Sequence, residues 1–414
     1  MKSFNIKNQP KSVFFCKKCV ASNQKPCPSD IKKDNHEHSA KEFLRFKNNV
    51  CSACCEVDKK YKNDTNVESI DWEKRENQLR NILDKYRSRN GSYDCIVPGS
   101  GGKDSVFQAE ILKTKYNMNP LTVTFSPIMY TETGMQNFHN WPTYGNVNNF
   151  LFSPRGSTYA KLSKLAFENL LHPFQPFVFG QRHYASHIAK LFKIPLIFIG
   201  ESFSEWGCEK ELDNQIEYTL KYFTKKKNET VLLSGINTDE LIKKHKIPEQ
   251  DLTYFLPLEE NIIIEQRIRV LFLGHFENFQ PQENFYFSTK TTKFKTSPDR
   301  TEGTYSKYVS LDDKVDGLHY WCALIKYGVG RATDEAAQEC RHNYITRDEA
   351  VTLVKKYDKE FPKKYFQDYL AFTGLKEEDF FNIVDGYRPE HLWEKVGNDY
   401  RFAENWKLKK AVYK

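Results

Sequence analysis

The sequence predicts an α/β fold with a parallel sheet, preceded by a cysteine-rich module and followed by a mostly helical region. Short apolar runs at 93–98, 121–125, 149–153 and 195–199 alternate with stretches of helical periodicity. Strands that alternate with helices favour a parallel sheet with crossover helices. The runs are apolar throughout rather than at every second residue, which is typical of strands covered on both faces. A length of 414 residues allows two or three domains.

Composition narrows the function classes. The net charge of +8, from 62 basic and 54 acidic residues, could help to bind a phosphorylated or carboxylated small molecule, or could be a solvated lysine-rich surface. No block of like charge resembles a nucleic-acid tail, so we expect no nucleic-acid partner. Neither a secretory signal nor a membrane-spanning run is found. We therefore expect a cytoplasmic protein with no membrane partner, whose ten cysteines stay reduced and can bind metal.

Helices are predicted before, between and after the strands. The first starts at the N-cap Asp71 and ends before Asn90. Those between the strands are expected near 105–116, 157–171 and 181–192. Later in the chain, 233–247 indicates a turn into a helix. The segment 346–357 opens with a capping box, because Thr346 is followed three residues later by a glutamate.

A glycine-rich loop joins the first strand of the sheet to its helix. Its residues are Ser100, Gly101, Gly102, Lys103, Asp104 and Ser105. Glycines let backbone N–H groups turn inward, and the helix start adds free N–H groups and a positive dipole end. This pattern predicts an oxyanion nest of phosphate size, the alternative being a plain turn with a capping aspartate. It is neither a Walker A loop nor a G-x-G-x-x-G dinucleotide fingerprint.

Two C-x-x-C pairs near the N-terminus predict a metal site. They are formed by Cys16, Cys19, Cys51 and Cys54. Four thiolates complete the tetrahedron of a closed, structural zinc site. A redox or iron–sulfur centre and free thiols are the alternatives. Cys55 could replace Cys54, and the spare potential ligands are Cys27, His36 and His38.

These motifs together carry a family resemblance. The pattern S-G-G-x-D-S after a strand resembles the PP-loop of ATP pyrophosphatases. With the paired C-x-x-C motifs, "IDWEKRE" and the late segment from "RTEGTYSKYVSLDDKVDG" to "TLVKKYD", the chain resembles the N-acetyl sugar amidotransferases over about residues 13–365. That family makes acetamidino sugars for O-antigens and flagellin glycans. The resemblance implies a zinc-binding module at 1–66, a Rossmann-like PP-loop ATP-binding domain at 67–245, and a mostly helical substrate-binding region at 246–414.

The resemblance also implies a reaction. ATP would adenylate the acetamido oxygen of a nucleotide-linked N-acetyl sugar and release pyrophosphate. Ammonia would then displace AMP and leave an acetamidino group. The ammonia would come from separate glutaminase and cyclase-like subunits, and no glutaminase nucleophile motif is found in this chain.

Roles for individual residues follow from the same resemblance. The loop 100–105 would grip the outer phosphates of ATP, with Lys103 as the counter-charge and Asp104 as a Mg²⁺ ligand. Adenine would lie near the end of the next strand, at 123–126. Glu201, at the end of the strand 195–199, would orient ammonia or bind metal, or else cap a helix. Substrate contacts would come from Arg300, Glu302, Tyr305, Lys326 and Arg331.

Other possibilities stay open. Asp239 and Glu240 could hold Mg²⁺ or merely cap their helix. A PP-loop tRNA-thiolating enzyme would also adenylate a carbonyl oxygen, with Cys208 as its candidate relay cysteine. A zinc-ribbon scaffold on a degenerate nucleotide-binding domain is the non-enzymatic alternative, and the intact S-G-G-x-D-S argues against it. The sequence does not distinguish UDP from CMP as the carrier of the sugar.

Overall fold

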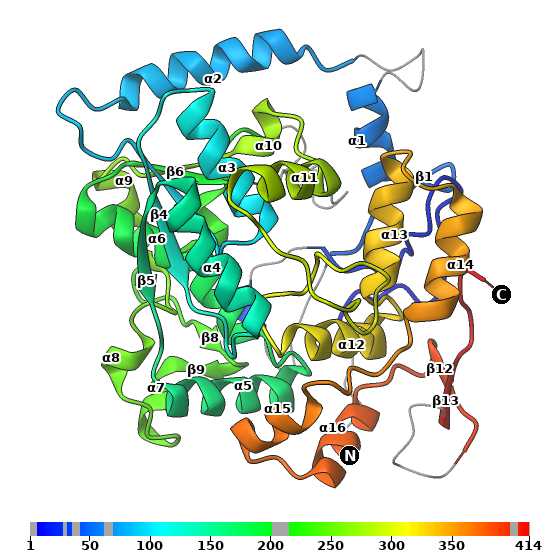
Figure 1. Cartoon of the computed structure of the whole chain (residues 1–414). Coiled ribbons are helices and arrows are strands. Elements are labelled where there is room, and N and C mark those ends of the chain that lie inside the picture. The colour runs from blue at the N-terminus through cyan, green and yellow to red at the C-terminus, as the bar shows by residue number, and fades with distance from the viewer. Residues whose placement is uncertain are drawn as a thin grey trace.

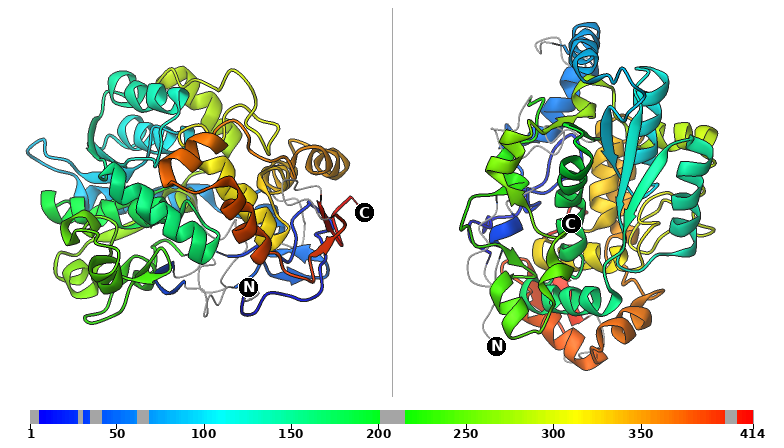
Figure 2. Two further views of the ribbon diagram at one scale, coloured as in Figure 1. Left: turned by 90° about the horizontal axis from the view of Figure 1, so that it is seen from below. Right: turned by 90° about the vertical axis from the view of Figure 1, so that its left-hand side faces the viewer.

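A five-stranded parallel sheet with helices on both sides forms the centre of the computed structural model, which describes residues 6–27, 31–34, 42–61, 69–200, 215–397 and 405–413 (Figure 1 and Figure 2). In sheet order the strands are β11 (Arg269–Phe272), β6 (Leu196–Ile199), β3 (Cys95–Pro98), β4 (Pro120–Phe125) and β5 (Asn148–Phe152). All four pairings are parallel, as the sequence predicts. Four strands coincide with the predicted apolar runs to within two residues. The fifth, β11, was not predicted and lies beyond residue 245, so the segment after that position supplies an edge of the sheet.

Each face of the sheet has its own apolar layer. Ile96 and Ile197 join one core cluster, whereas their neighbours Val97 and Phe198 join another. The first layer is covered by α5 (Gly156–Leu170) and α6 (Gln175–Phe192), and the second by α2 (Trp72–Tyr86) and α3 (Lys103–Thr114). This two-sided covering is why the strands are continuously apolar in the sequence.

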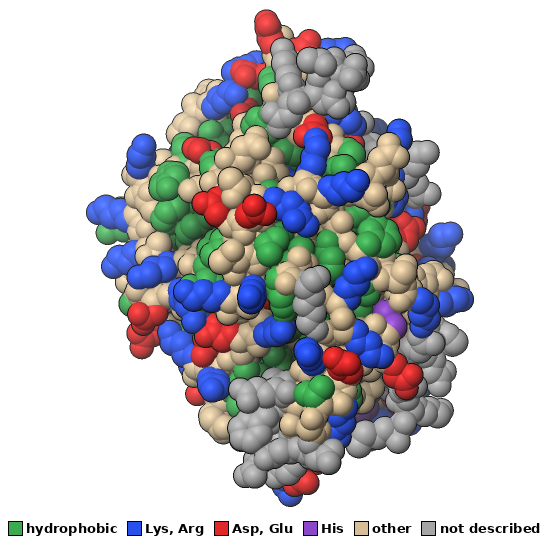
Figure 3. All heavy atoms as spheres, turned by 90° about the vertical axis from the view of Figure 1, so that its right-hand side faces the viewer, with side chains coloured by type: hydrophobic (Ala, Val, Ile, Leu, Met, Phe, Trp, Pro, Cys, Tyr) green, Lys and Arg blue, Asp and Glu red, His purple; other side chains and the backbone are tan. Residues whose placement is uncertain are grey.

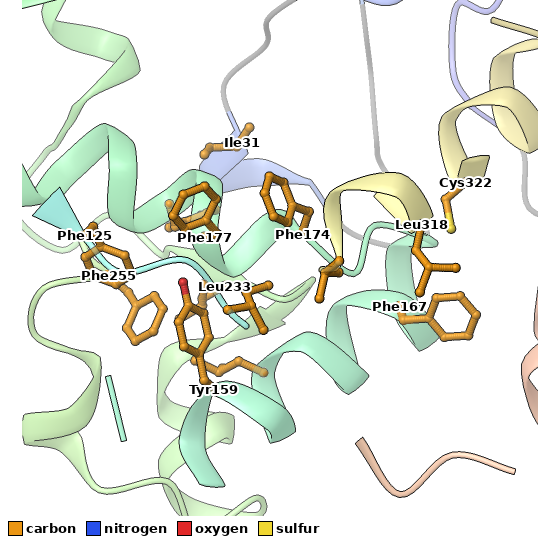
Figure 4. Close-up of a cluster of buried hydrophobic side chains, with 14 of the residues drawn as sticks. Ile31, Phe125, Tyr159, Phe167, Phe174, Phe177, Leu233, Phe255, Leu318 and Cys322 are labelled. Carbon is orange, nitrogen blue, oxygen red and sulfur yellow. The ribbon is translucent and has the colours of Figure 1, made fainter. Parts of the chain in front are cut away.

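The core of the sheet continues into the C-terminal helices. Figure 4 shows Phe167 of α5 beside Leu318 and Cys322 of α12. On β4, the ring of Phe125 meets that of Phe255 edge-on at 5.0 Å between centroids. A Cβ at Gly180 would lie 2.2 Å from the same ring, so only glycine lets α6 approach β4 this closely. The sheet and the C-terminal helices therefore share one packed interior.

Further helices surround this core. The longer ones are α1 (Ser52–Tyr61), α4 (Glu132–Gly145), α11 (Pro281–Thr291), α12 (Asp316–Tyr327), α13 (Arg331–Arg341), α14 (Arg347–Tyr357), α15 (Phe366–Thr373) and α16 (Glu377–Gly386). The short ones are η1 (Ile31–Lys33), η4 (Leu220–Tyr222), α7 (Thr238–Lys243), α8 (Glu249–Leu252), α9 (Glu260–Glu265) and α10 (Leu273–Phe276). The mostly helical character predicted for the later part of the chain is confirmed.

Four short strand pairs complete the described structure. They are β1 (Phe46–Lys47) with β2 (Val50–Cys51), β7 (Thr224–Lys225) with β10 (Leu258–Glu259), β8 (Leu232–Leu233) with β9 (Ile236–Asn237), and β12 (Trp393–Lys395) with β13 (Trp406–Leu408). The N-terminal pair and α1 lie beside α13 and α14 (Figure 1). The cysteine-rich segment is therefore packed on the C-terminal helices.

Most of the predicted helix starts agree with the structure. The side chain of Asp71 accepts a hydrogen bond from the N–H of Lys74, and Thr346 and Glu349 form the predicted capping box. Helix α6 differs, because it begins six residues before the predicted position. Pro176 in its first turn fixes a helical φ where no N–H partner is needed, and so extends the helix at this end.

Candidate functional site

A cleft of about 470 Å³ opens at the topological switch point of the sheet. The strand order places β3 beside β6, and from this pair the chain builds outward in opposite directions. Open α/β sheets bind ligands in the crevice outside the carboxyl ends of such strands. The residues that follow the two strands, Gly99 after Pro98 and Gly200 after Ile199, line the cleft. Its position is therefore fixed by the order of the strands.

The predicted loop lies at this switch point. Gly102 is the N-cap of α3 and offers no capping side chain, so the first N–H groups of the helix are left for a ligand. The Ser105 hydroxyl donates to the Gly102 carbonyl at 2.9 Å. Gly101 has φ +83°, and a Cβ there would lie 2.8 Å from the Asn137 carbonyl of α4. Only glycine fits at this position, for both backbone and packing reasons.

Lys103 and Asp104 lie on the cleft wall, held by α11. The Lys103 ammonium lies 2.5 Å from one oxygen of Asp104, and the Asn284 amide donates to the other oxygen at 2.8 Å. The Ser288 hydroxyl donates to the Lys103 carbonyl at 2.9 Å. Asn284 and Ser288 are fully buried. The basic and acidic groups are thus oriented by a helix about 180 positions away in the chain.

The opposite wall comes from residues 308–316. The Ser100 hydroxyl donates to the Asp312 carboxylate at 2.6 Å. The Thr131 N–H donates to the Asp312 carbonyl at 3.2 Å. Gly134 leaves no room for a side chain, since a Cβ would lie 2.4 Å from the Asp312 Cα. The segment is therefore clamped onto the loop that follows β4.

Buried carboxyl groups hold this wall in place. The Asp313 carboxylate accepts hydrogen bonds from the N–H groups of Ile128 and Val315. Burial raises the pKa of Asp313 well above its ordinary value, although these hydrogen bonds oppose the shift. Burial also raises the pKa of Asp316 to about 6, against the positive charge of Arg331. The Arg331 guanidinium stacks 4.3 Å from the Tyr320 ring and faces the cleft.

The predicted substrate residues are not all in one place. Arg331 lines the cleft. Arg300 is ion-paired with Glu360 at 2.5 Å. The remaining three each have a protein partner: Glu302 accepts from the Lys364 N–H at 2.9 Å, Tyr305 donates to Glu339 at 2.7 Å, and Lys326 donates to the Leu170 carbonyl at 2.9 Å. Glu201 and Cys208 fall outside the described residues.

The end of β4, proposed above for adenine, does not line the cleft. Phe125 is instead packed into the core, and none of residues 123–126 is a cleft residue. An apolar pocket of about 200 Å³ adjoins the cleft at Pro98, Gln181 and Ile199. Tyr218 and Phe223 form part of its wall. This pocket has a mostly apolar wall.

The four predicted cysteines form a closed cluster. Their sulfur atoms all lie within 4.8 Å of one another, and the four residues are buried. Hydrogen bonds with the other three thiols lower the pKa of Cys16. Backbone N–H groups donate to two of the sulfurs, that of Ala21 to Cys19 at 3.4 Å and that of Cys51 to Cys16 at 3.3 Å. Such bonds are typical of thiolates that bind a metal.

The cluster selects Cys54 and not its neighbour as the fourth ligand. The Cys55 sulfur is not part of the group, and burial near Asp58 raises the pKa of the Cys55 thiol. Arg341 of α13 is half-buried beside the cluster; burial opposes its charge, but the attraction of Cys19 and Cys51 raises its pKa. The site could hold a zinc ion in a tetrahedron of sulfur.

Several cleft residues were not predicted from the sequence. They are Gln108, Tyr308, Asp312 and Tyr320, and behind the wall Asn284, which donates to Asp104. Asp312 and Tyr308 lie within the late segment "KYVSLDD", so the acidic pair after an apolar turn was a usable signal. Asn284 carries no sequence signal, because its role comes from the packing of α11 on α3.

Neither the surface nor the remaining predicted acidic residues indicate a second site in the part of the chain that the structure describes. Asp239 is exposed and pairs with Lys243 within α7, at 4.0 Å, away from the cleft. The face in Figure 3 intersperses basic with acidic side chains. Among the described residues, no helix combines the length and apolarity needed to cross a lipid bilayer.

Fold and site together define an α/β protein with a ligand cleft at the switch point and a separate cysteine cluster. Residues 302–410 match the family model described as LPS biosynthesis protein WbpG-like, C-terminal domain. At a coarse level this match supports the predicted resemblance, because it connects the late segment with lipopolysaccharide biosynthesis. Eight described residues of this part, from Tyr308 to Arg331, line the cleft.

Two more distant similarities were found. A stretch of 52 residues is 42% identical to an uncharacterized protein of Methanocaldococcus jannaschii, MJ1599. It covers 13% of this chain and 19% of that relative, so the chain spans about a fifth of the relative's length. The structure of NMN synthetase from Francisella tularensis aligns over 56% of this chain and all of that chain, with 14% identity and a TM-score of 0.25. That likeness is too distant to support a conclusion.

Proposed function

We propose that the chain is an ATP-dependent, AMP- and pyrophosphate-forming amidotransferase. Its substrate is a nucleotide-linked N-acetyl sugar, whose acetamido oxygen is adenylated and then replaced by ammonia. The product is an acetamidino sugar for a lipopolysaccharide O-antigen or a flagellin glycan. The reaction needs this activation because a neutral amide is a poor electrophile and oxide is a poor leaving group.

One observation carries the proposal. The S-G-G-x-D-S loop and the WbpG-like segment form opposite walls of one cleft, joined by the Ser100–Asp312 hydrogen bond. A phosphate-binding loop alone would suit many nucleotide enzymes. A wall that belongs to a domain of lipopolysaccharide biosynthesis favours a substrate from that chemistry.

The cleft residues have clear parts in such a reaction. The N–H groups at the start of α3 and the Lys103 ammonium would hold the outer phosphates, and the apolar pocket beside Ile199 would take adenine. Asp104 would hold Mg²⁺ together with phosphate oxygens, since this ion is usually bound by one or two carboxylates plus substrate phosphates. Arg331 would pair with an anionic group of the sugar nucleotide.

The cysteine cluster would hold zinc in a structural role. Its four buried sulfurs leave no open position for a substrate. The cluster packs against Ala336, Ala337 and Cys340 of α13, the helix that also carries Arg331. Metal at this site would therefore keep the cleft wall in position.

The ammonia would come from separate glutaminase and cyclase-like subunits. This part of the proposal rests on the family resemblance, and on the absence of a glutaminase motif from the printed sequence. Without these subunits the protein would then use ammonium salts as its source of nitrogen, but only when ammonium is present at high concentration.

Pyrophosphate release tests the proposed function. Purified protein is incubated with Mg·ATP, ammonium chloride and a panel of UDP- and CMP-linked acetamido sugars. We expect pyrophosphate only with a matching sugar, and a product about one mass unit lighter, because oxygen is replaced by NH. Sulfur transfer to co-purified tRNA would instead support the thiolation alternative. Absence of ATP binding would support the scaffold alternative.

A further inference from the structure

A second cavity, of about 170 Å³, adjoins the nucleotide cleft. The two cavities share Lys103, Asp104, Tyr308 and Arg331 among their wall residues. One side of the second cavity is a face of α13 that carries Asp334, Glu335, Gln338 and Glu339. Basic side chains line the cavity as well, namely Lys25, Lys103, Arg331 and Arg341. We name this space the acidic pocket after its α13 face. A small molecule in it would lie next to the site where the phosphates of ATP are expected.

Glu335 has an acceptor atom that the protein leaves unused. The residue is only 8% exposed. One carboxylate oxygen, Oε2, accepts a hydrogen bond from the Thr304 hydroxyl. The other, Oε1, has no hydrogen-bond partner among the described residues. A buried acceptor without a partner costs about 1–3 kcal/mol, and more when it is charged, so this position favours a ligand that brings an N–H donor.

The other acids of the pocket already have partners. Glu339 accepts hydrogen bonds from the hydroxyl groups of Tyr305, at 2.7 Å, and Tyr308, at 3.3 Å. Asp334 is ion-paired with Lys25 at 2.6 Å. Burial raises the pKa of Glu339 despite its two hydrogen bonds. Glu335 is therefore distinguished from its neighbours by a buried oxygen that has no hydrogen-bond partner among the described residues.

The nearby cationic side chains that the structure describes are not paired with this oxygen of Glu335. Lys103 is paired with Asp104 at 2.5 Å, and Arg331 is stacked on Tyr320 at 4.3 Å. Arg341 is directed to the cysteine cluster. Among the described residues, none of these cations forms an ion pair with Glu335 within 4.0 Å. A mobile cation or a neutral amine is the donor that the geometry leaves room for.

We infer that the acidic pocket receives ammonia, and that the Glu335 carboxylate, turned toward the pocket, is the base that takes its proton. This inference rests on the proposed function. The ammonia nitrogen forms a bond to the carbon of the adenylated amide, and the C–O bond to AMP breaks with its electron pair leaving on the phosphate oxygen. One N–H proton of the adduct passes to Glu335. The product is an amidinium cation. It can leave for solvent, because the protonated Glu335 is neutral and no longer attracts it.

The position also suits the charge that develops. An ammonia nitrogen that attacks carbon becomes positive, and the amidinium product stays positive at neutral pH. A buried carboxylate stabilises such a charge more strongly than an exposed one, because little water screens it. The sugar's acetamido group would enter from the nucleotide cleft, and ammonia would wait on the α13 side.

The test separates the two half-reactions. Exchange of labelled pyrophosphate into ATP, with the matching sugar nucleotide and no ammonium, reports adenylation alone. We expect Glu335→Gln to keep exchange within about twofold of the wild type and to lose on the order of 100-fold in kcat/KM for ammonium chloride. Hydroxylamine, which is unprotonated at neutral pH and less dependent on a base, should restore most of the rate. Exposed Glu378→Gln on α16 is the matched control and should be unchanged.

Each other outcome has a definite meaning. No exchange by the wild type with any sugar of the panel would overturn the proposed function itself. Exchange by the wild type, with equal ammonium kinetics in Glu335→Gln, would overturn only the role of Glu335. Loss of exchange and ammonium use together would also overturn it, since Glu335 would then serve adenylation or folding. Thermal melting checks the fold of each variant. If Glu335→Gln does not fold, Glu335→Asp replaces it. This change shortens the side chain by one methylene, and we expect an intermediate kcat/KM for ammonium.

Glu201 is the rival base, because the sequence itself suggested it for ammonia. The same two assays are applied to Glu201→Gln. Loss of ammonium use in that variant, with normal use in Glu335→Gln, would assign the proton to Glu201 and overturn the inference. The reverse pattern would support it.

Discussion

The cysteine cluster and the cleft at the switch point of the sheet are built in opposite ways. The cluster uses four identical side chains, brought together by two local motifs and closed from solvent. The cleft collects unlike residues from segments between 98 and 331 and stays open. A closed set of ligands suits a structural ion, whereas an open set with unused donors suits a substrate that comes and goes.

Helix α13 connects these two regions. Ala336, Ala337 and Cys340 pack on the cysteine cluster, while Arg331 and Glu335 face the cavities. The cluster and the cleft are therefore structurally coupled, although they are built differently. Damage to the cluster should reach the cleft through the fold, while damage to the cleft should leave the cluster intact.

The largest effect is expected from Asp104→Ala. Loss of the carboxylate should lower turnover by about 10³-fold or more, because Asp104 is the proposed metal ligand beside the phosphates. Pyrophosphate release measures turnover, and circular dichroism should show an unchanged fold. Asp239→Ala is the control, since its side chain is 76% exposed and away from the cleft. Full activity of Asp104→Ala would refute the phosphate-site assignment.

The second effect concerns the cluster and should be structural. Cys16→Ser should lose bound zinc and about 5 kcal/mol or more in the free energy of unfolding, because a structural metal contributes directly to folding. Metal analysis and urea denaturation measure the two quantities. Cys55→Ser, next to the cluster but outside it, should keep both. A stable, metal-free and fully active Cys16→Ser protein would contradict the structural assignment.

Gly134→Ala tests the clamp between the two walls of the cleft. The new Cβ would lie 2.4 Å from the Asp312 backbone, so we expect a loss of about 3 kcal/mol in stability, near the upper end for overpacking. The KM for ATP should rise as the wall moves. Gly156→Ala is the control, because a Cβ there meets nothing within 4 Å. Equal stability of the two variants would show that the wall is not clamped.

The smallest effect is a pH dependence at the start of α13. Asp358 accepts hydrogen bonds from Gly330 and Thr333, and burial raises its pKa from 3.8 to about 6. Between these values the folded protein binds more protons than the unfolded protein, so the contribution of Asp358 to stability falls as pH rises from about 4 to 6. Asp358→Asn lacks this titration. The stability difference between wild type and variant should therefore shrink by about 2 kcal/mol over that range, measured by urea denaturation.

A constant difference would contradict the raised pKa. The exposed pair formed by Asp368 and Lys314 provides the control, because Asp368→Asn should show no comparable trend over this pH range. Comparing variant with wild type at each pH cancels the titration of all other groups.

The local patterns were predicted well and the distant contacts were not. Strand runs, the capping box and the cysteine pairs depend on neighbours within a few residues, and the structure places them as expected. The edge strand β11 was missed because charged residues interrupt its apolar run. Of the proposed substrate residues, Arg331 faces the cleft, whereas Arg300 and Lys326 are engaged by the protein itself.

By itself, the sequence determined the parallel sheet, the glycine loop after its first strand and the set of four cysteines, because each is encoded by residue types at short, fixed spacing. Only the tertiary structure decided what surrounds that loop. Ser100 meets Asp312 across 212 positions, and Asp104 meets Asn284 across 180. No local spacing can encode such contacts, because they arise when α11 packs on α3 and the segment 308–316 closes over the switch point of the sheet.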